Sequence, residues 1–276
     1  MERKSQTSGD ARQSRQQARQ QAIAEAVMSE GAIRIETLAE RFDISVMTAH
    51  RDLDELESQG LLRKSRGVAT AMATSLIESS DVYRSGRQLE EKQAIAAAAA
   101  EFIEPGQSVI VDDSTTASHV LPHLRGRKPL TVITNTLPVM NEVRTMPGIS
   151  LIGVGGQYYN WCSAFLGHTA TEAFTQLRAD VLVMSTSAII DDMAFHQRLE
   201  TVDAKRAMFA SATTRLLLAD HTKFDQRAVH AMAALSDFDA VIVDWRTDAA
   251  HVARLRQAGV TVIVANRISQ RSIHAS

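Results

Sequence analysis

The sequence lacks the residues and runs that define disulfide-rich, zinc-binding and membrane proteins. Cys162 is the single cysteine among 276 residues, which excludes an intramolecular disulfide and any zinc site built from several cysteines. No apolar run approaches the length of a membrane span, and the polar first residues contain no apolar stretch of the kind that directs secretion. We therefore expect a cytoplasmic protein without a membrane partner, and we expect neither a metal nor a cofactor.

An excess of positive charge is also missing. The formal net charge is −2, and residues 1–70 carry 11 lysines and arginines against 11 aspartates and glutamates. A basic domain is the usual electrostatic footprint of a nucleic-acid-binding protein, so the overall charge gives no support for that function. The distribution of charge is more informative, because basic residues cluster in the N-terminal tail and at residues 63–66. A domain with no net charge can still have a positive face.

Composition and periodicity divide the chain into four parts. Residues 1–14 are polar and predict a disordered tail, and a helix is expected from about Ser14 to Ser29. Residues 15–71 are interpreted as a winged helix-turn-helix, and residues 72–88 as a linker that is partly helical. Residues 89–276 form the second domain, in which short β-branched runs alternate with helical stretches.

The stretch from Ile35 to Thr70 predicts a short helix, a turn, a second helix and a basic hairpin. Ser45 suits the N-cap of the second helix, whose apolar stripe is expected to consist of Val46, Ala49, Leu53 and Leu56. The opposite face and the wing supply the expected DNA contacts, which are Ser45, Thr48, His50, Arg51, Arg63, Lys64 and Arg66. By itself the pattern also fits an ordinary amphipathic helical hairpin with solvated charges.

Seven apolar runs in the second domain predict the strands of a mainly parallel sheet covered on both faces by helices. The expected strands are residues 108–112, 130–134, 149–154, 180–184, 215–220, 240–244 and 260–264. Helices are expected at residues 89–103, 116–125, 137–146, 165–178, 200–213 and 247–258.

Ligands of such sheets bind beyond the carboxyl ends of the strands, where small hydroxyl residues and helix N-termini favour anions. These positions suit a phosphorylated sugar or sugar acid, and Lys205 and Lys223 are expected to supply positive charge. The expected effector-binding residues are Asp112, Ser114, Thr115, Thr116, Asn135, Thr136, Gly155, Gly156, Gln157, His196, Gln197, Lys205 and Lys223. Taken singly, each has a structural alternative: a helix cap, a turn, a surface histidine or a solvated lysine.

Residues 35–70 resemble the DNA-binding domain of the DeoR family of bacterial transcriptional regulators. The resemblance is carried by Ser45, Thr48, Arg51-Asp52-Leu53, Leu56 and Gly60-Leu61 before a basic wing. Ala49, His50 and Ser65-Arg66-Gly67 depart from the family pattern, which leaves the base preference open.

Residues 89–265 are similar to the sensor domain of the same family, whose fold resembles ribose-5-phosphate isomerase. The matching positions are Asp112-x-Ser-Thr-Thr116, Thr134-Asn135, Gly155-Gly156, Gly167, Lys205 and Asp220-x-x-Lys223-Phe224. The resemblance implies a homo-oligomer, dimer or tetramer, that binds double-stranded operator DNA, represses a carbohydrate operon and is released by a phosphorylated intermediate.

Two other functions stay open from the residues alone. A sugar-phosphate isomerase needs a general base, for which Asp112, Asp113, Asp191, Asp192 and Glu200 are candidates. The chain lacks the Asp-Gly-Ala-Asp-Glu run of the isomerases it resembles and has no Gly-x-Ser-x-Gly motif, so we expect no catalysis. The second alternative is a ligand-binding protein whose N-terminal helices contact another protein.

Overall fold

The computed structural model describes residues 16–267 except 25, 28–29, 31 and 72–80. Two compact units divide the chain, Met1–Tyr83 and Arg84–Ser276. The predicted tail at 1–14 lies outside the described residues, as does most of the predicted linker. The described end of that linker contains a short helix, α4 (Asp81–Ser85).

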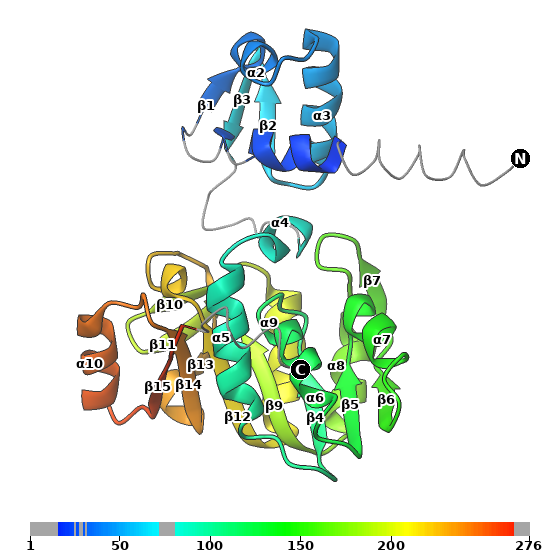
Figure 1. Ribbon diagram of the computed structural model, residues 1–276, viewed down its shortest axis with the longest axis vertical. Coiled ribbons are helices and arrows are strands. Elements are labelled where there is room, and N and C mark those ends of the chain that lie inside the picture. The colour runs from blue at the N-terminus through cyan, green and yellow to red at the C-terminus, as the bar shows by residue number, and fades with distance from the viewer. Residues whose placement is uncertain (1–15, 25, 28–29, 31, 72–80, 268–276) are drawn as a thin grey trace, which may run out of the picture. The chain divides into compact units, whose positions relative to one another are not determined.

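The N-terminal unit is a winged helix-turn-helix (Figure 1). Residues 16–24 and 26–27 are helical, as predicted, and are followed by β1 (Ala32–Arg34), α2 (Ile35–Arg41) and α3 (Val46–Ser58). The wing is the hairpin of β2 (Leu62–Ser65) and β3 (Val68–Ala71), and β1 pairs with β3 in an antiparallel sheet of order β1-β3-β2. Strand β1 is three residues long, too short to leave a period in the sequence.

The core of this unit corrects the predicted apolar stripe at one position. Ala49, Leu53 and Leu56 of α3 are buried as expected, but Val46 is 45% exposed. Asp52 takes the additional buried place, because its carboxylate accepts hydrogen bonds from Arg19 (Nε at 2.6 Å, Nη2 at 3.1 Å) and from Gln20 Nε2 at 3.1 Å. A charged residue thereby joins the first helix to α3.

The C-terminal unit is built on the predicted parallel sheet of seven strands, in the order β15-β14-β12-β9-β4-β5-β6. All its strand pairs are parallel. The strands are β4 (Ser108–Val111), β5 (Leu130–Thr134), β6 (Ile149–Gly153), β9 (Ala179–Ser185), β12 (Ala212–Ala219), β14 (Ala240–Asp244) and β15 (Val262–Ala265). Each prediction of a strand is confirmed, with ends shifted by up to three residues.

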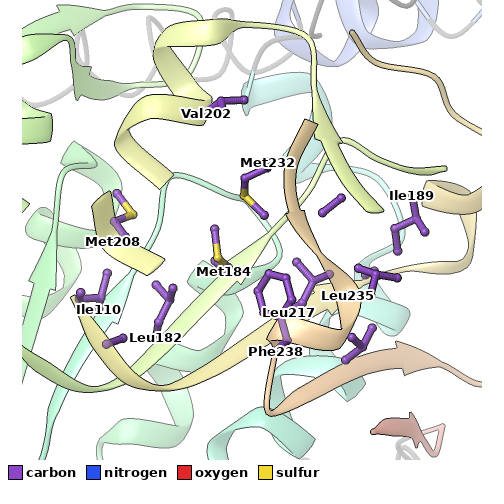
Figure 2. Close-up of a cluster of buried hydrophobic side chains, with 14 of the residues drawn as sticks. Ile110, Leu182, Met184, Ile189, Val202, Met208, Leu217, Met232, Leu235 and Phe238 are labelled. Carbon is purple, nitrogen blue, oxygen red and sulfur yellow. The ribbon is translucent and has the colours of Figure 1, made fainter. Parts of the chain in front are cut away.

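Alternate side chains of the inner strands enter two different cores. Ile110, Leu182 and Leu217 belong to a core that also contains residues of α8 (His168–Thr175), α9 (Leu199–Ala210) and α10 (Ala249–Gln257). Figure 2 shows these three residues with Val202 and Met208 of α9. The neighbouring strand residues face α5 (Leu89–Ala100), α6 (Leu121–Leu124) and α7 (Leu137–Val143) on the other side (Figure 1). The predicted helix 116–125 is a 3-10 turn, Ala117–Val120, followed by α6.

Short antiparallel strands, which the sequence did not predict, surround the sheet. Strands β7 (Gln157–Tyr159) and β8 (Ala164–Leu166) form a hairpin, so the predicted helix 165–178 begins later, at His168. Strands β10 (Ala188–Ile190), β11 (Met193–His196) and β13 (His230–Ala234) form a separate sheet, and two further 3-10 turns are His221–Phe224 and Leu235–Asp237.

Candidate nucleic-acid interface and effector site

The first turn of α3 is fixed by the predicted cap. Ser45 Oγ accepts the backbone N–H of Thr48 at 3.1 Å and lies 2.8 Å from Thr48 Oγ1. Arg51 is exposed one turn later, and His50 is half-buried at the flank of that face. Met47 is 65% exposed and Val46 45% exposed, so the outer face of the N-terminal half of α3 combines apolar and cationic side chains. Such a surface can read both base methyl groups and acceptor edges.

The basic residues of the wing differ in exposure and in ion pairing. Arg66 and Gly67 form the tip with φ values of 50° and 75°, which is the left-handed geometry of a tight hairpin turn. Arg63 and Arg66 are exposed, whereas Lys64 Nζ pairs with Asp54 Oδ1 and its backbone N–H donates to Glu57 Oε1 at 2.9 Å. The charge of Lys64 is therefore partly compensated within the unit, and Arg63 and Arg66 are the freer cations of the wing.

Two of the predicted effector residues, Ser114 and Lys205, contact a third, the buried carboxylate of Asp112. Asp112 follows β4 and is fully buried. Its Oδ1 accepts the backbone N–H of Ser114 at 3.0 Å and Ser114 Oγ at 2.6 Å, and its Oδ2 accepts the backbone N–H of Ser185 at 2.9 Å. Ser114 Oγ also accepts the backbone N–H of Ala117 at 3.0 Å. Asp112 thus holds together the ends of β4 and β9.

Lys205 of α9 completes this cluster as an ion-paired residue. Its Nζ pairs with Asp112 Oδ2, lies 3.1 Å from Asp113 Oδ1 and donates to the backbone carbonyl of Ser185 at 3.2 Å. Burial acts to lower the pKa of Lys205, but the Asp112 and Asp113 carboxylates outweigh it and raise that pKa. Burial likewise acts to raise the pKa of Asp113, but Lys205 and Arg84 hold it below its ordinary value. One ammonium faces two carboxylates, so the triad offers no spare positive charge.

The spare positive charge comes from a residue that sequence reasoning missed, Lys92 of α5. It is 3% exposed, and its Nζ donates to Thr115 Oγ1 at 3.0 Å and to the backbone carbonyl of Arg84. Burial first, and then the neighbouring Lys223, lower the pKa of Lys92 to about 8. Lys92 makes no ion pair with any described residue, so its charge is available to an anion.

Lys223 lies beside Lys92 on the 3-10 turn after β12. Its Nζ is 3.9 Å from Asp220 Oδ2, a long contact. Burial acts to raise the pKa of Asp220, but Lys223 and the hydrogen bonds from Thr222 lower it. Thr115, which accepts the hydrogen bond of Lys92, stands between Ser114 and Thr116, and these two neighbours are buried in the loop after β4. Two ammonium groups beside a loop rich in hydroxyl residues match the needs of a phosphate.

His119 is also close to Lys92 and shares a helical spacing of four residues with His123. Burial and neighbouring cations lower the pKa of both histidines. Among the described residues no third His, Cys, Asp or Glu joins them in a group that could hold a metal ion.

The predicted residues after β5 support the β7–β8 hairpin. Asn135 is fully buried, and its side-chain Nδ2 donates to the Phe165 carbonyl at 2.8 Å while its backbone carbonyl accepts the Phe165 N–H at 2.8 Å. Thr136 Oγ1 donates to the Ser163 carbonyl at 3.2 Å. Gly156 packs so tightly that a Cβ there would lie 2.8 Å from the Leu166 carbonyl oxygen. The hairpin therefore depends on these residues for its position.

The remaining predicted effector residues, at 155–157 and 196–197, differ in solvent exposure. Gly155, Gly156 and Gln157 are exposed, and His196 is 3% exposed with its Nδ1 2.8 Å from Ser187 Oγ. Burial first, and then Lys205, hold the pKa of His196 well below 6.5, so its imidazole is neutral at neutral pH. Gln197, next in the chain, is half-buried.

A winged helix-turn-helix followed by an α/β unit with a buried polar cluster at its sheet edge is the architecture of a ligand-responsive DNA-binding regulator. Comparison with known proteins agrees with this class. Residues 19–75 match the model of the DeoR-like helix-turn-helix domain, and residues 87–245 match that of the DeoR C terminal sensor domain. The protein therefore belongs to the DeoR family of transcriptional regulators.

Curated relatives span nearly the whole chain. The transcriptional repressor AccR of Agrobacterium fabrum is 33% identical over 84% of this chain and 90% of that protein. The HTH-type transcriptional repressor CsqR of Escherichia coli is 31% identical over 86% and 91%, and the glycerol-3-phosphate regulon repressor of the same species is 31% identical over 83% and 91%. All three relatives are transcriptional or regulon repressors, which confirms the predicted transcriptional regulator.

Solved structures align less closely. Ribose 5-phosphate isomerase from Plasmodium falciparum covers 49% of this chain and 52% of its own at 13% identity, with a TM-score of 0.36. The translation initiation factor eIF-2B of Pyrococcus horikoshii covers 80% and 81% at 12% identity, with a TM-score of 0.40. The family assignment rests on the domain models and the curated relatives. No helix of the described residues is long and apolar enough to cross a membrane.

Proposed function

We propose that this regulator represses a carbohydrate catabolism operon and is released from its operator by a phosphorylated sugar or sugar acid. The observation that carries the proposal is the pair Lys92 and Lys223, with Lys92 hydrogen-bonded to Thr115 of the Ser114-Thr115-Thr116 loop. A dianionic phosphate would remove the repulsion between the two ammonium groups and satisfy the free charge of Lys92. The protein would act in the cytoplasm, where its operator lies.

The predicted DNA contacts keep their roles in this proposal. Arg51 and Thr48 enter the major groove from α3, His50 flanks them, and Arg63 and Arg66 reach the backbone from the wing. A homo-oligomer would present two such units to one repeated or palindromic site. The effector would shift the population toward a DNA-incompetent arrangement by an amount set by its differential affinity for the two states.

Fluorescence anisotropy with DNA from the promoter next to the gene tests both halves of the proposal. Arg51→Ala should weaken operator binding by about tenfold or more, as loss of a bidentate base contact does, while Arg144→Ala, an exposed arginine of the C-terminal unit, leaves it unchanged. Binding by the wild type should fall steeply as salt rises. Equal affinities for the two variants, or a flat salt dependence, would contradict the groove assignment.

The effector half is tested by adding phosphorylated sugars and sugar acids to the same complex. We expect at least one of them to release the DNA from the wild type, and none to release it from Lys223→Met at the same concentration. Unchanged release from this variant would remove Lys223 from the phosphate site.

A further inference from the structure

The N-terminus of α9 lacks a side-chain cap, and several buried polar atoms on and next to its first turn have no hydrogen-bond partner among the described residues. Helix α9 is 12 residues long, and its N-cap, Arg198, provides no side-chain hydrogen bond to the first turn. Thr201 in that turn is 1% exposed, and its Oγ1 has no hydrogen-bond partner among the described residues. The first N–H groups of a helix carry a partial positive charge that attracts anions.

Four more buried atoms without a hydrogen-bond partner in the described part of the chain lie on or beside the same turn. They are Trp161 Nε1, His196 Nε2, Gln197 Oε1 and Arg198 Nε. Arg198 joins the hairpin to the helix, because its Cζ lies 4.7 Å from the centre of the Trp161 ring. Each unpaired buried polar atom costs about 1–3 kcal/mol, so such a concentration within a few residues indicates a ligand-binding surface.

The charge of Arg198 indicates what this surface binds. Lys205, seven residues further along α9, is neutralised by Asp112 and Asp113, but Arg198 makes no ion pair with any described residue. Trp161 Nε1 and Arg198 Nε can only donate hydrogen bonds, and Thr201 adds a hydroxyl donor. Glu200 in the same turn is exposed, so solvent screens its negative charge. The three donors, the guanidinium and the helix N-terminus together favour an anionic group, whereas Gln197 and His196 suit hydroxyl groups.

This anion-binding surface is made of other residues than the lysine pair. His196, next in the chain to Gln197, is influenced electrostatically by Asp113, and Lys92 contacts Thr115, two residues beyond Asp113. Both cationic groups are therefore linked through their neighbours to the loop that contains Asp113. We propose that the effector is a phosphorylated sugar acid, whose carboxylate is bound by Arg198, Trp161 and the first turn of α9.

The inference rests on the proposed function, because it needs the phosphate to occupy the Lys92–Lys223 pair. The decisive comparison uses two linear ligands that differ only at C1, gluconate 6-phosphate with a carboxylate and glucitol 6-phosphate with a hydroxymethyl group. Erythronate 4-phosphate and erythritol 4-phosphate repeat the comparison for a shorter chain. Isothermal titration calorimetry of the full chain measures all four.

For the wild type we expect the acid of at least one pair to bind about tenfold or more tightly than its alcohol, as a charge-assisted hydrogen bond contributes. Arg198→Gln should abolish this preference and leave the affinity for the alcohol within about twofold. Trp161→Phe keeps the ring under Arg198 and removes the N–H donor, so it should weaken the acid only. Arg144→Gln serves as the matched control and should change neither affinity.

The results separate the two proposals. If the alcohols and acids bind the wild type equally and Lys92→Met loses both, the phosphate site stands and the carboxylate inference is wrong. If Arg198→Gln weakens the acid and the alcohol by the same factor while circular dichroism shows a folded protein, the selectivity assigned to Arg198 is also wrong. If neither the phosphorylated acids nor the alcohols bind the wild type, the proposed phosphate site itself fails.

Discussion

Replacement of Lys92 by methionine should make the protein more stable and unresponsive to phosphate at the same time. The pKa of Lys92 falls from 10.5 to about 8, and each pKa unit corresponds to about 1.4 kcal/mol. Keeping the ammonium in its buried place therefore costs about 3 kcal/mol at neutral pH. Methionine fills similar volume without a charge, but it leaves the Arg84 carbonyl and Thr115 Oγ1 without their donor, which costs about 1–2 kcal/mol.

The net expectation for Lys92→Met is a gain of about 1–2 kcal/mol in the free energy of unfolding at pH 7. A domain of this size gains about 2–4 °C in Tm per kcal/mol, so the transition of the C-terminal unit should rise by about 4 °C in differential scanning calorimetry. Inorganic phosphate and phosphorylated polyols, which should raise the Tm of the wild type, should leave that of the variant unchanged.

The pH dependence of this difference tests its cause. Lys92 has a lowered pKa in the folded protein, so the penalty is fully present below about pH 8 and is relieved as pH rises toward 10.5. The Tm advantage of Lys92→Met over the wild type should therefore disappear by about pH 9.5. A variant that is less stable than the wild type by the same amount at pH 7 and pH 9.5 would refute the claim that the buried ammonium is costly.

Further predictions concern the binding pH and the N-terminal unit. Affinity of the wild type for a phosphate monoester should drop about tenfold from pH 7 to pH 9 as Lys92 loses its proton, because the monoester, with a second pKa of about 6, is mainly a dianion at both values. Titration calorimetry should show no such drop in Lys92→Met. Asp52→Ala should lower the free energy of unfolding of the N-terminal unit by about 2 kcal/mol, because it removes the buried acceptor of Arg19. The loss stays this small because Arg19 is exposed enough to be solvated by water. Ser45→Ala should cost about 1 kcal/mol.

Each of these three predictions has a control variant, and a stated result would contradict it. A phosphate affinity that falls equally in Lys92→Met and the wild type would show that another group titrates. For the N-terminal unit, Asp54→Ala removes an exposed carboxylate of the same helix and should change Tm much less than Asp52→Ala. Equal losses for the two aspartates would contradict the buried role of Asp52. Ser58→Ala, at the other end of α3, is the control for Ser45→Ala.

The seven strands and the helix-turn-helix could be predicted because their signals are local. Runs such as 108–112 and 240–244 are apolar on both faces, which a buried parallel strand requires, and Ser45 caps the helix that it precedes in sequence. The β7–β8 hairpin could not be predicted, since each strand has three residues and depends on Asn135 and Thr136 from another part of the chain. Short strands held by distant partners leave no period in the sequence.

The chemistry of the site was predictable in part for the same reason. Strand ends place Asp112, Ser114 and Lys223 at one sheet edge whatever the details of packing. The sequence does not single out Lys92, because a lysine beside two glutamates at the start of an alanine-rich helix is typical of a solvated surface, and only the fold shows that it is buried next to Thr115. Whether a buried charge has an oppositely charged partner depends on residues that are distant in the sequence, so it could not be predicted.

Lys205 and Lys92 are buried in opposite electrostatic environments. Both lysines are almost fully buried, but two carboxylates raise the pKa of Lys205, whereas burial and a second lysine lower that of Lys92. The first lysine is already paired, so a ligand gains little by approaching it, and its loss would leave Asp112 and Asp113 as unpaired buried charges. The second has no carboxylate partner among the described residues, so an anion that reached it would stabilise its charge. A phosphate should therefore change the environment of Lys92 far more than that of Lys205.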